Sequence, residues 1–266
     1  MSLPSRLRLI ALSLAMSAMT AGCGSAARSE PEPLLIAAAS DLQLVLPRIL
    51  EAYRTEAGAS ASSVFGASGT LSAQIEQGAP FDLFLSADRG YVSALSERGA
   101  IRADSVRDYA VGELVMVVGE SLPEIVQAED LKTARFRVMA IANPSHAPYG
   151  RAAREFLERS GIWDAVSNRV VLAANVREAA RFVESGDAEV GFVSGSSARA
   201  ASGVRVVAID ASKHTPLIQS LGIPTRSTRV EEAERFARFL VGPIAQALLA
   251  REGFAPAAAV VASENP

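Results

Sequence analysis

The chain has a single cysteine, Cys23, and only two histidines, His146 and His214. One cysteine cannot form a disulfide within the chain, so the folded domain must rely on its hydrophobic core. No group of histidine, cysteine and carboxylate residues has the spacing of a metal site. We therefore expect neither a disulfide framework nor a metal centre.

Runs of basic residues are also missing. Twenty-six basic against 29 acidic residues give a formal net charge of −3, and no Lys/Arg run is interleaved with aromatic residues, which argues against nucleic acid as a partner. After the N-terminal region, no segment has the roughly 18 uninterrupted apolar residues that a membrane helix needs. With 49% hydrophobic residues, the chain can still bury a large core, in one large domain or two small ones.

The first 23 residues are typical of an export signal. A positive region with Arg6 and Arg8 precedes an apolar stretch, and small residues lead to Cys23 in "MTAGC". A lipoprotein signal places the residue that receives the lipid at this position. We expect residues 1–23 to be a lipoprotein signal, with Cys23 lipidated, and residues 24–33 to be a tether. An ordinary cleaved signal is the alternative.

From residue 34 onward, short apolar runs alternate with amphipathic stretches. Strand-like and helix-like segments alternate three times up to residue 99, which predicts a parallel sheet covered by helices on both faces. Apolar positions between Leu42 and Tyr53 predict a helix with Pro47 inside it, and therefore a local kink. The pattern restarts near residue 113 and ends in a helical region at 230–252, which favours two α/β lobes over one long sheet.

Hydroxyl residues and glycines stand at the predicted strand-to-helix junctions. The junctions are Ser40, Ser68 in "FGASGT", "NPSHAPYG" at 143–150, "AANV" at 173–176 and "VSGSS" at 193–197. Ligands of open parallel sheets bind beyond the carboxyl ends of the strands, where helix N-termini present free N–H groups. Because these junctions contain hardly any cation, they predict an anion held by backbone amides and hydroxyls. Each serine taken alone could instead be a helix cap.

The residues give less support to catalysis. Neither "GASGT" nor "GFVSGS" is a G-x-S-x-G nucleophile elbow. A serine hydrolase would need His146 or His214 beside one of the serines, and the sequence identifies no such pair. Asp82 and Asp88 in "FDLFLSAD" could suggest a cation site. Local hydrogen bonding by Asp82 and capping of the following helix by Asp88 are the simpler interpretations.

Several segments together resemble the periplasmic molybdate-binding proteins of molybdate ABC transporters. They are "AAASDL", "FGASGTLSAQIEQGAPFDLFLSAD", "NPSHAPYG", "GIWDAV", "NVREAARFVESGDAEVGFVSGS" and "GPIAQALLAREGF", in family order between residues 34 and about 255. The resemblance implies an α/β, type II periplasmic-binding fold, in which two lobes joined by crossing strands close on an oxyanion. We expect residues 34–110 and 216–266 to form the first lobe and residues 111–215 the second.

The resemblance also implies which residues bind the ligand. The hydroxyls of Ser40 and Ser68 in the first lobe, and the backbone of Tyr149 and Val176 in the second, are expected to hold molybdate. The fifth position, Ser194, departs from the enterobacterial pattern, in which a tyrosine in "V-Y-G-S" reaches the anion. Serine is several ångströms shorter than tyrosine, so a water or a shifted loop could take the place of the phenol.

The predicted function is capture of molybdate, and of tungstate, outside the cytoplasmic membrane and delivery to an ABC permease driven by a cytoplasmic ATPase. The protein is expected to be a periplasmic monomer that catalyses no reaction, needs no cofactor and contacts the membrane only through a lipid on Cys23. Another tetrahedral oxyanion such as sulfate is an alternative ligand, because cage size and not donor type separates the two. A secreted serine hydrolase is the alternative from another class.

Overall fold

The computed structural model describes residues 32–123, 125, 127–134 and 136–257. The predicted signal at 1–23, with Cys23, and most of the tether at 24–33 lie outside these residues. Within the described ranges, no helix has the length and hydropathy of a membrane span.

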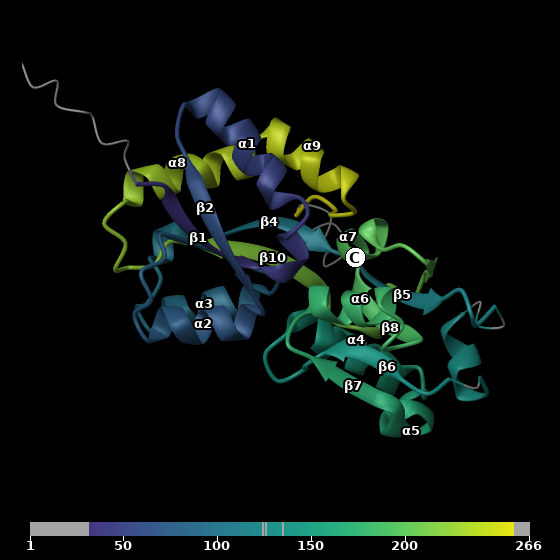
Figure 1. The fold of residues 1–266 in the computed structure, drawn as a ribbon. Helices are drawn as coiled ribbons and strands as arrows, with labels where there is room; N and C mark the ends of the chain where they lie inside the picture. The colour runs from purple at the N-terminus through teal and green to yellow at the C-terminus, as the bar shows by residue number, and fades with distance from the viewer. Residues whose placement is uncertain (1–31, 124, 126, 135, 258–266) are drawn as a thin grey trace, which may run out of the picture. The chain divides into compact units, whose positions relative to one another are not determined.

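The first lobe is built on a five-stranded sheet with the strand order β2-β1-β3-β10-β4. Figure 1 labels β1, β2, β4 and β10 of this sheet. The strands are β1 (Leu34–Ala39), β2 (Ala61–Gly66), β3 (Leu83–Ser86), β4 (Arg107–Gly112) and β10 (Leu217–Gly222). β1 runs parallel to β2 and β3, as predicted. The sheet is nevertheless mixed and not wholly parallel, because β10 runs antiparallel to β3 and β4.

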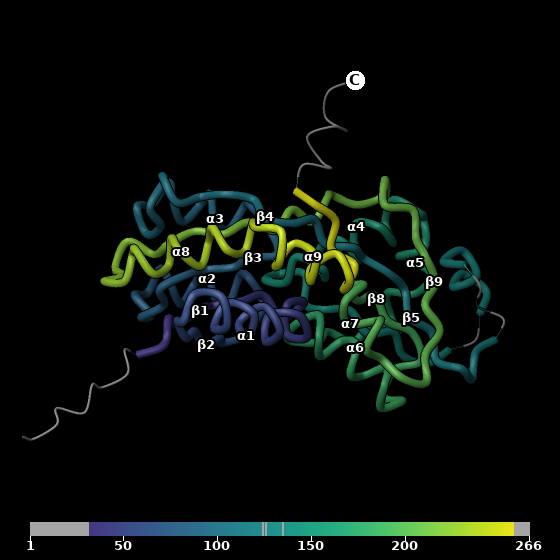
Figure 2. Tube along the Cα trace, turned by 90° about the horizontal axis from the view of Figure 1, so that it is seen from above, coloured from purple at the N-terminus to yellow at the C-terminus, as the bar shows by residue number. Residues whose placement is uncertain are grey.

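Helices cover both faces of this sheet. α1 (Leu46–Ala57), α8 (Val230–Leu240) and α9 (Pro243–Arg251) lie along one face, and α2 (Ser68–Glu76) and α3 (Arg89–Glu97) along the other (Figures 1 and 2). Successive strand residues point to opposite faces. Ile36 and Ala38 therefore belong to the core under α1 and α8, whereas Ala37 belongs to the core under α2 and α3. Burial on both faces explains the continuous apolar run of this strand.

The second lobe has its own five-stranded sheet, in the order β7-β6-β8-β5-β9. The strands are β5 (Leu114–Gly119), β6 (Met139–Ala142), β7 (Val170–Ala173), β8 (Val190–Ser194) and β9 (Val204–Val207), and the helices are α4 (Pro148–Arg159), α5 (Trp163–Val166), α6 (Val176–Glu184) and α7 (Gly195–Ala200). β6 is parallel to β7 and β8, whereas β5 is antiparallel to β8 and β9. Phe156 of α4 packs on Phe192 of β8 in this core, with ring centroids 5.5 Å apart.

The chain passes between the two sheets at residue 113, between β4 and β5, and again between β9 and β10. Short 3-10 helices complete the described elements: η1 (Ser40–Leu42), η2 (Ala103–Ser105), η3 (Ala128–Lys132), η4 (Ser167–Arg169) and η5 (Ala211–Lys213).

The kink predicted at Pro47 is wrong. α1 begins at Leu46, after η1 and a turn, so Pro47 lies in the first turn of the helix. N–H groups in the first turn have no partner within the helix, and a proline there leaves no intrahelical bond unmade. Leu42 precedes the helix, yet its side chain still joins the core with Ile49 and Tyr53.

Gly150 marks a close approach between α4 and the end of β6. A Cβ at Gly150 would lie 1.9 Å from the carbonyl oxygen of Ala142. Gly150→Ala is expected to lower the free energy of unfolding by about 3 kcal/mol, because the clashing atom belongs to the backbone and cannot turn aside. In thermal denaturation this corresponds to a fall in Tm of roughly 6 to 12 °C.

Gly119→Ala is the matched control for this variant, because a Cβ at Gly119 would lie 3.4 Å from its nearest neighbour, the Glu189 carbonyl oxygen. Equal Tm values for the two alanine variants would contradict the close approach at Gly150.

Candidate functional site

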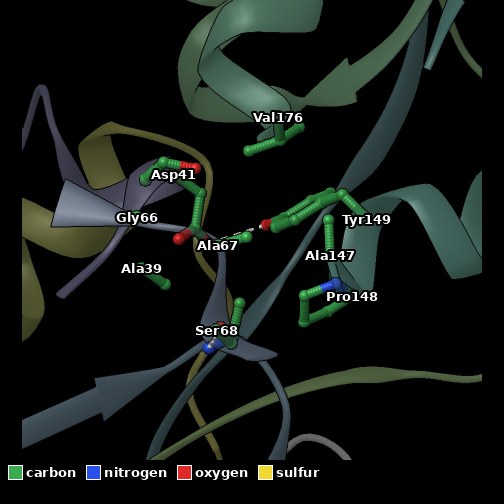
Figure 3. A pocket seen from close by; sticks show the side chains of 11 residues that line it. Ala39, Asp41, Gly66, Ala67, Ser68, Ala147, Pro148, Tyr149 and Val176 are labelled. Carbon is green, nitrogen blue, oxygen red and sulfur yellow. Dashed lines mark hydrogen bonds between the residues drawn. The ribbon is translucent and has the colours of Figure 1, made fainter. Parts of the chain in front are cut away.

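A small cavity lies where residues that follow strands of both lobes meet (Figure 3). It is lined by Ala39, Ser40, Asp41, Gly66, Ala67, Ser68 and Ala87 from the first lobe and by Ala147, Pro148, Tyr149 and Val176 from the second. Its volume is about 10 Å³, close to the smallest space that holds one water-sized group. So small a cavity suits a compact ligand.

Four helices begin at the cavity wall. η1 begins at Ser40, α2 at Ser68, α4 at Pro148 and α6 at Val176. The N–H groups of a first helical turn have no partner within their own helix and carry a partial positive charge. Pro148 has no N–H, so Tyr149 is the first residue of α4 that offers one. The site therefore combines helix starts from both lobes, as the junctions in the sequence predicted.

The start of α6 leaves one backbone donor at the cavity. The Asn175 side chain caps this helix and accepts from the N–H groups of Arg177 and Glu178, at 3.1 and 3.0 Å. Val176, the first helical residue, is not among the groups that this cap satisfies. Val176 lines the cavity, so its N–H is a candidate donor to a ligand oxygen.

Helix capping does not account for Ser40 or Ser68. The N-cap of η1 is Ala39 and that of α2 is Ala67, and neither helix has a side-chain capping bond. The Ser68 hydroxyl oxygen accepts from the N–H of Ala87 at 3.0 Å, so its own hydrogen can still be donated. Both serines are at least 95% buried, and both line the cavity.

Ser194 does act as a cap. It is the N-cap of α7, and its oxygen accepts from the Ser197 N–H at 3.2 Å and lies 3.0 Å from the Ser196 hydroxyl oxygen. It is not among the residues that line the cavity. The structure thus brings together four of the five predicted ligand residues, and the role of Ser194 stays a prediction.

Asp41 is a cavity residue that the sequence analysis did not single out. Its side chain is 1% exposed. Oδ2 accepts from the Tyr149 hydroxyl at 3.0 Å and from Nε2 of Gln219 at 2.7 Å, whereas Oδ1 is buried without a hydrogen-bond partner. Burial raises the pKa of this carboxyl to about 6, although the bonds from Gln219 and Tyr149 and the nearby backbone N–H groups of Asp41 and Leu42 favour its charged form. The only hint in the sequence is its place beside Ser40 at a helix start.

Contacts between the lobes surround the cavity. The Gly69 N–H donates to the His146 carbonyl at 2.9 Å, and the Ser196 hydroxyl donates to the Asp41 carbonyl at 2.7 Å. In Figure 3 the Tyr149 ring reaches from α4 toward the wall that contains Asp41. Because the two walls belong to different lobes, a ligand can enter only when these contacts break and the lobes part.

The two histidines make other contacts. The His146 ring lies 2.9 Å from the Ser145 hydroxyl and 3.1 Å from the Ala174 carbonyl oxygen, and the His214 ring lies 2.9 Å from the Thr215 carbonyl oxygen. Neither ring is hydrogen-bonded to a serine of the cavity. The serine hydrolase alternative therefore gains no support.

The two aspartates of "FDLFLSAD" have structural roles. Asp88 caps α3 by accepting from the Gly90 N–H at 2.7 Å, which confirms that prediction. Asp82 accepts from the Leu35 N–H and the Ser227 hydroxyl. Among the residues that the structure describes, no group of histidine, cysteine and acidic side chains could hold a metal ion.

Comparisons with known proteins identify the family of the chain. A family model described as bacterial extracellular solute-binding protein matches residues 34–255. Molybdate-binding protein ModA from Azotobacter vinelandii is 32% identical over 68% of this chain and 73% of its own length. Its namesake from Escherichia coli (strain K12) is 31% identical over 87% and 91%. The structure of the Azotobacter vinelandii periplasmic molybdate-binding protein matches with a TM-score of 0.77 and 29% identity, over 83% of this chain and 98% of that one.

The chain therefore belongs to the bacterial extracellular solute-binding proteins and, within them, to the ModA family. The match to a solved periplasmic binding protein confirms the predicted α/β fold with two lobes. Proteins of this family are binding components and not enzymes, and no cofactor is implied.

Gly69 offers a test of lobe closure. A Cβ at this position would lie 2.7 Å from the His146 carbonyl oxygen and 2.7 Å from the Tyr91 hydroxyl. Gly69→Ala is expected to keep the lobes from closing fully and to weaken ligand binding roughly tenfold or more, as measured by calorimetry. Thr70→Ala, at an exposed position in the same turn of α2, is the control and should bind like the parent protein. Unchanged affinity in Gly69→Ala would show that the contact is not needed for binding.

Proposed function

We propose that the protein binds molybdate in the cavity between its two lobes. The observation that carries the proposal is the convergence of two serine hydroxyls and two helix starts of the opposite lobe on one small cavity, which no lysine or arginine of the described chain lines. Hydroxyls and backbone amides act as donors to the oxygens of such a ligand. The Asp41 carboxyl is the one acidic group that lines the cavity. The names of the ModA relatives support molybdate as the ligand.

The energetics favour a small oxyanion over a neutral solute. A hydrogen bond to a charged group contributes about 1.5 to 3 kcal/mol, so several converging donors can offset much of the desolvation of a dianion. Tungstate has the same charge and tetrahedral shape, and we propose that it binds to the same donors. Sulfate is the second candidate ligand, because the same donors suit it and only the size of the closed cavity discriminates against it.

In this proposal, the protein captures the ligand outside the cytoplasmic membrane and delivers it to an ABC permease. Both lobes donate to one anion, so binding favours the closed arrangement, and the permease can distinguish loaded from empty protein by the separation of the lobes. The protein acts as a monomer in the periplasm, with Cys23 as its point of lipid attachment.

Removal of a cavity hydroxyl tests the ligand assignment. Ser40→Ala and Ser68→Ala are each expected to weaken molybdate binding by about 1 kcal/mol or more, because each leaves one ligand oxygen without a donor. The measurement is isothermal titration calorimetry of the mature protein with molybdate, tungstate, sulfate and phosphate. Ser194→Ala, measured in the same way, decides whether that hydroxyl contributes.

Ser121→Ala is the control for these serine variants, since Ser121 is exposed and lies outside the cavity. If molybdate gives neither heat nor a thermal shift with the parent protein, the proposed function is wrong. If both cavity variants bind as tightly as the parent, the two serines do not hold the ligand.

The membrane anchor has its own test. Cys23→Ser is expected to release the exported protein from the membrane fraction, because the sulfur that would receive the lipid is gone. Fractionation of cells that express the full chain, followed by immunoblotting, measures the distribution. A parent protein that is already fully soluble after export would contradict lipidation at Cys23.

A further inference from the structure

We propose that Asp41 is a further ligand-binding residue that holds one proton between its Oδ1 atom and an oxygen of the bound oxyanion. Each binding event then brings one proton into the cavity together with the ligand. This inference rests on the proposed function, because it requires that an oxyanion occupies the cavity that Asp41 lines.

The two oxygens of the Asp41 carboxyl differ in their surroundings. Oδ2 receives two hydrogen bonds, from the Tyr149 hydroxyl and from the Gln219 amide. Oδ1 is buried and has no hydrogen-bond partner, which is costly for a polar atom. Because two donors already point at Oδ2, a proton on this carboxyl belongs on Oδ1.

Because Asp41 lines the cavity, an oxyanion held there is placed to supply the partner that Oδ1 lacks. Two negative groups in contact inside a low-dielectric cavity repel each other strongly unless a proton lies between them. With that proton, Oδ1–H donates to the ligand in the same way as the hydroxyls of Ser40 and Ser68. A ligand without a proton, such as molybdate, requires that the proton be taken up from solvent. A ligand such as hydrogen phosphate brings the proton with it. The complex holds one shared proton in both cases.

The groups around Asp41 supply no cation to replace this proton. Tyr149 faces it from α4, and Gln219 faces it from β10, where the Gln219 amide oxygen accepts from the Tyr109 hydroxyl. Burial raises the pKa of both tyrosines well above its ordinary value, so both stay neutral. β10 carries no charged residue.

The charged residues of the other neighbouring elements have partners elsewhere or face solvent. On α6, Arg177 pairs with Glu184, Glu178 accepts from the Ala174 N–H, and Arg181 is exposed. Arg199 of α7 pairs with Glu113, and Arg151 of α4 pairs with Asp88. On β4, Arg107 pairs with Glu234, and Asp108 pairs with Arg89. None of them is among the residues that line the cavity.

The sign of the pH dependence follows from this arrangement. Burial raises the pKa of the Asp41 carboxyl to about 6, so the ligand-free carboxyl is mostly ionised at pH 7.5 and must gain a proton when the oxyanion binds. Affinity is therefore greatest below about pH 6 and falls as the pH rises. Above that point the Kd should increase about tenfold per pH unit, since one proton is taken up per ligand.

Calorimetric titration with sodium molybdate between pH 6 and pH 9 tests the inference. We expect the Kd of the parent protein to rise about tenfold per unit between pH 7 and pH 9. In Asp41→Asn the Kd should be independent of pH within about twofold, because the amide oxygen can accept at the Oδ2 position while the amide N–H donates at the Oδ1 position without titrating. Titrations at pH 7.5 in buffers of different ionisation enthalpy should give uptake of about one proton per molybdate in the parent and none in Asp41→Asn.

Asp164→Asn makes the same chemical change at an exposed position on α5 and should follow the parent. Tyr149→Phe is a second, independent variant. It removes one bond that favours the charged form of Asp41, so the loss of affinity should begin at a higher pH than in the parent.

The outcomes separate the two proposals. Molybdate binding by the parent with a constant Kd and no proton uptake would overturn the inference and leave the proposed function standing. Loss of binding at every pH in a folded Asp41→Asn, or an unchanged onset in Tyr149→Phe, would also overturn the inference. If the parent binds no molybdate at any pH, the proposed function itself fails.

Discussion

The hydrogen bonds that meet at the Asp41 carboxyl join three parts of the molecule. Asp41 follows the first strand of the first lobe, Tyr149 belongs to the second lobe, and Gln219 lies on β10, the strand by which the chain returns from the second lobe to the first. Gly112, at the end of β4, makes room for this arrangement, because a Cβ there would lie 2.2 Å from the Tyr149 hydroxyl and 2.8 Å from Nε2 of Gln219. The cavity wall and the crossing strands next to it therefore belong to one packed cluster.

The two lobes build the cavity by the same structural device. In each sheet an edge strand and its neighbour run parallel, β2 with β1 and β7 with β6. Parallel strands end at the same edge of a sheet, so the segments that follow them begin side by side. η1 and α2 begin in this way in the first lobe, and α4 and α6 in the second. The starts of these helices thus bring backbone donors from both lobes to the cavity, which no lysine or arginine of the described residues lines. This arrangement depends on the strand topology more than on individual side chains.

The parts of the site that follow from local order along the chain could be predicted from the sequence. Ser40 and Ser68 stand where an apolar run gives way to a helical pattern, and so do the stretches that contain Tyr149 and Val176. The family resemblance singled out Tyr149 and Val176 within those stretches, and all four residues line the cavity. Asp41 could not be found in this way, because its side-chain partners lie 108 and 178 residues away in the sequence. The same holds for β10, whose apolar run is interrupted by a glutamine and a serine that are fully buried only through tertiary contacts. Ser194 shows that the junction pattern also selects residues outside the cavity. A junction serine that caps a helix and one that faces a cavity look alike in the sequence.

A buried acid among neutral donors gives this cavity a different selectivity from one built on arginine. A fixed cation attracts every anion that fits, whatever its protonation state, because Coulomb attraction needs no hydrogen at a particular place. Hydroxyls, amides and a carboxyl with one free oxygen favour only a ligand whose oxygens, and one shared proton, match their positions. The two oxygens of Asp41 have different roles, so binding of a proton does not disturb the closed arrangement of the lobes. Oδ2 keeps its bonds to Tyr149 and Gln219, and only Oδ1 changes its protonation. The bonds from Tyr149 and Gln219 to Oδ2 can therefore form in the closed arrangement whether or not Oδ1 carries the shared proton.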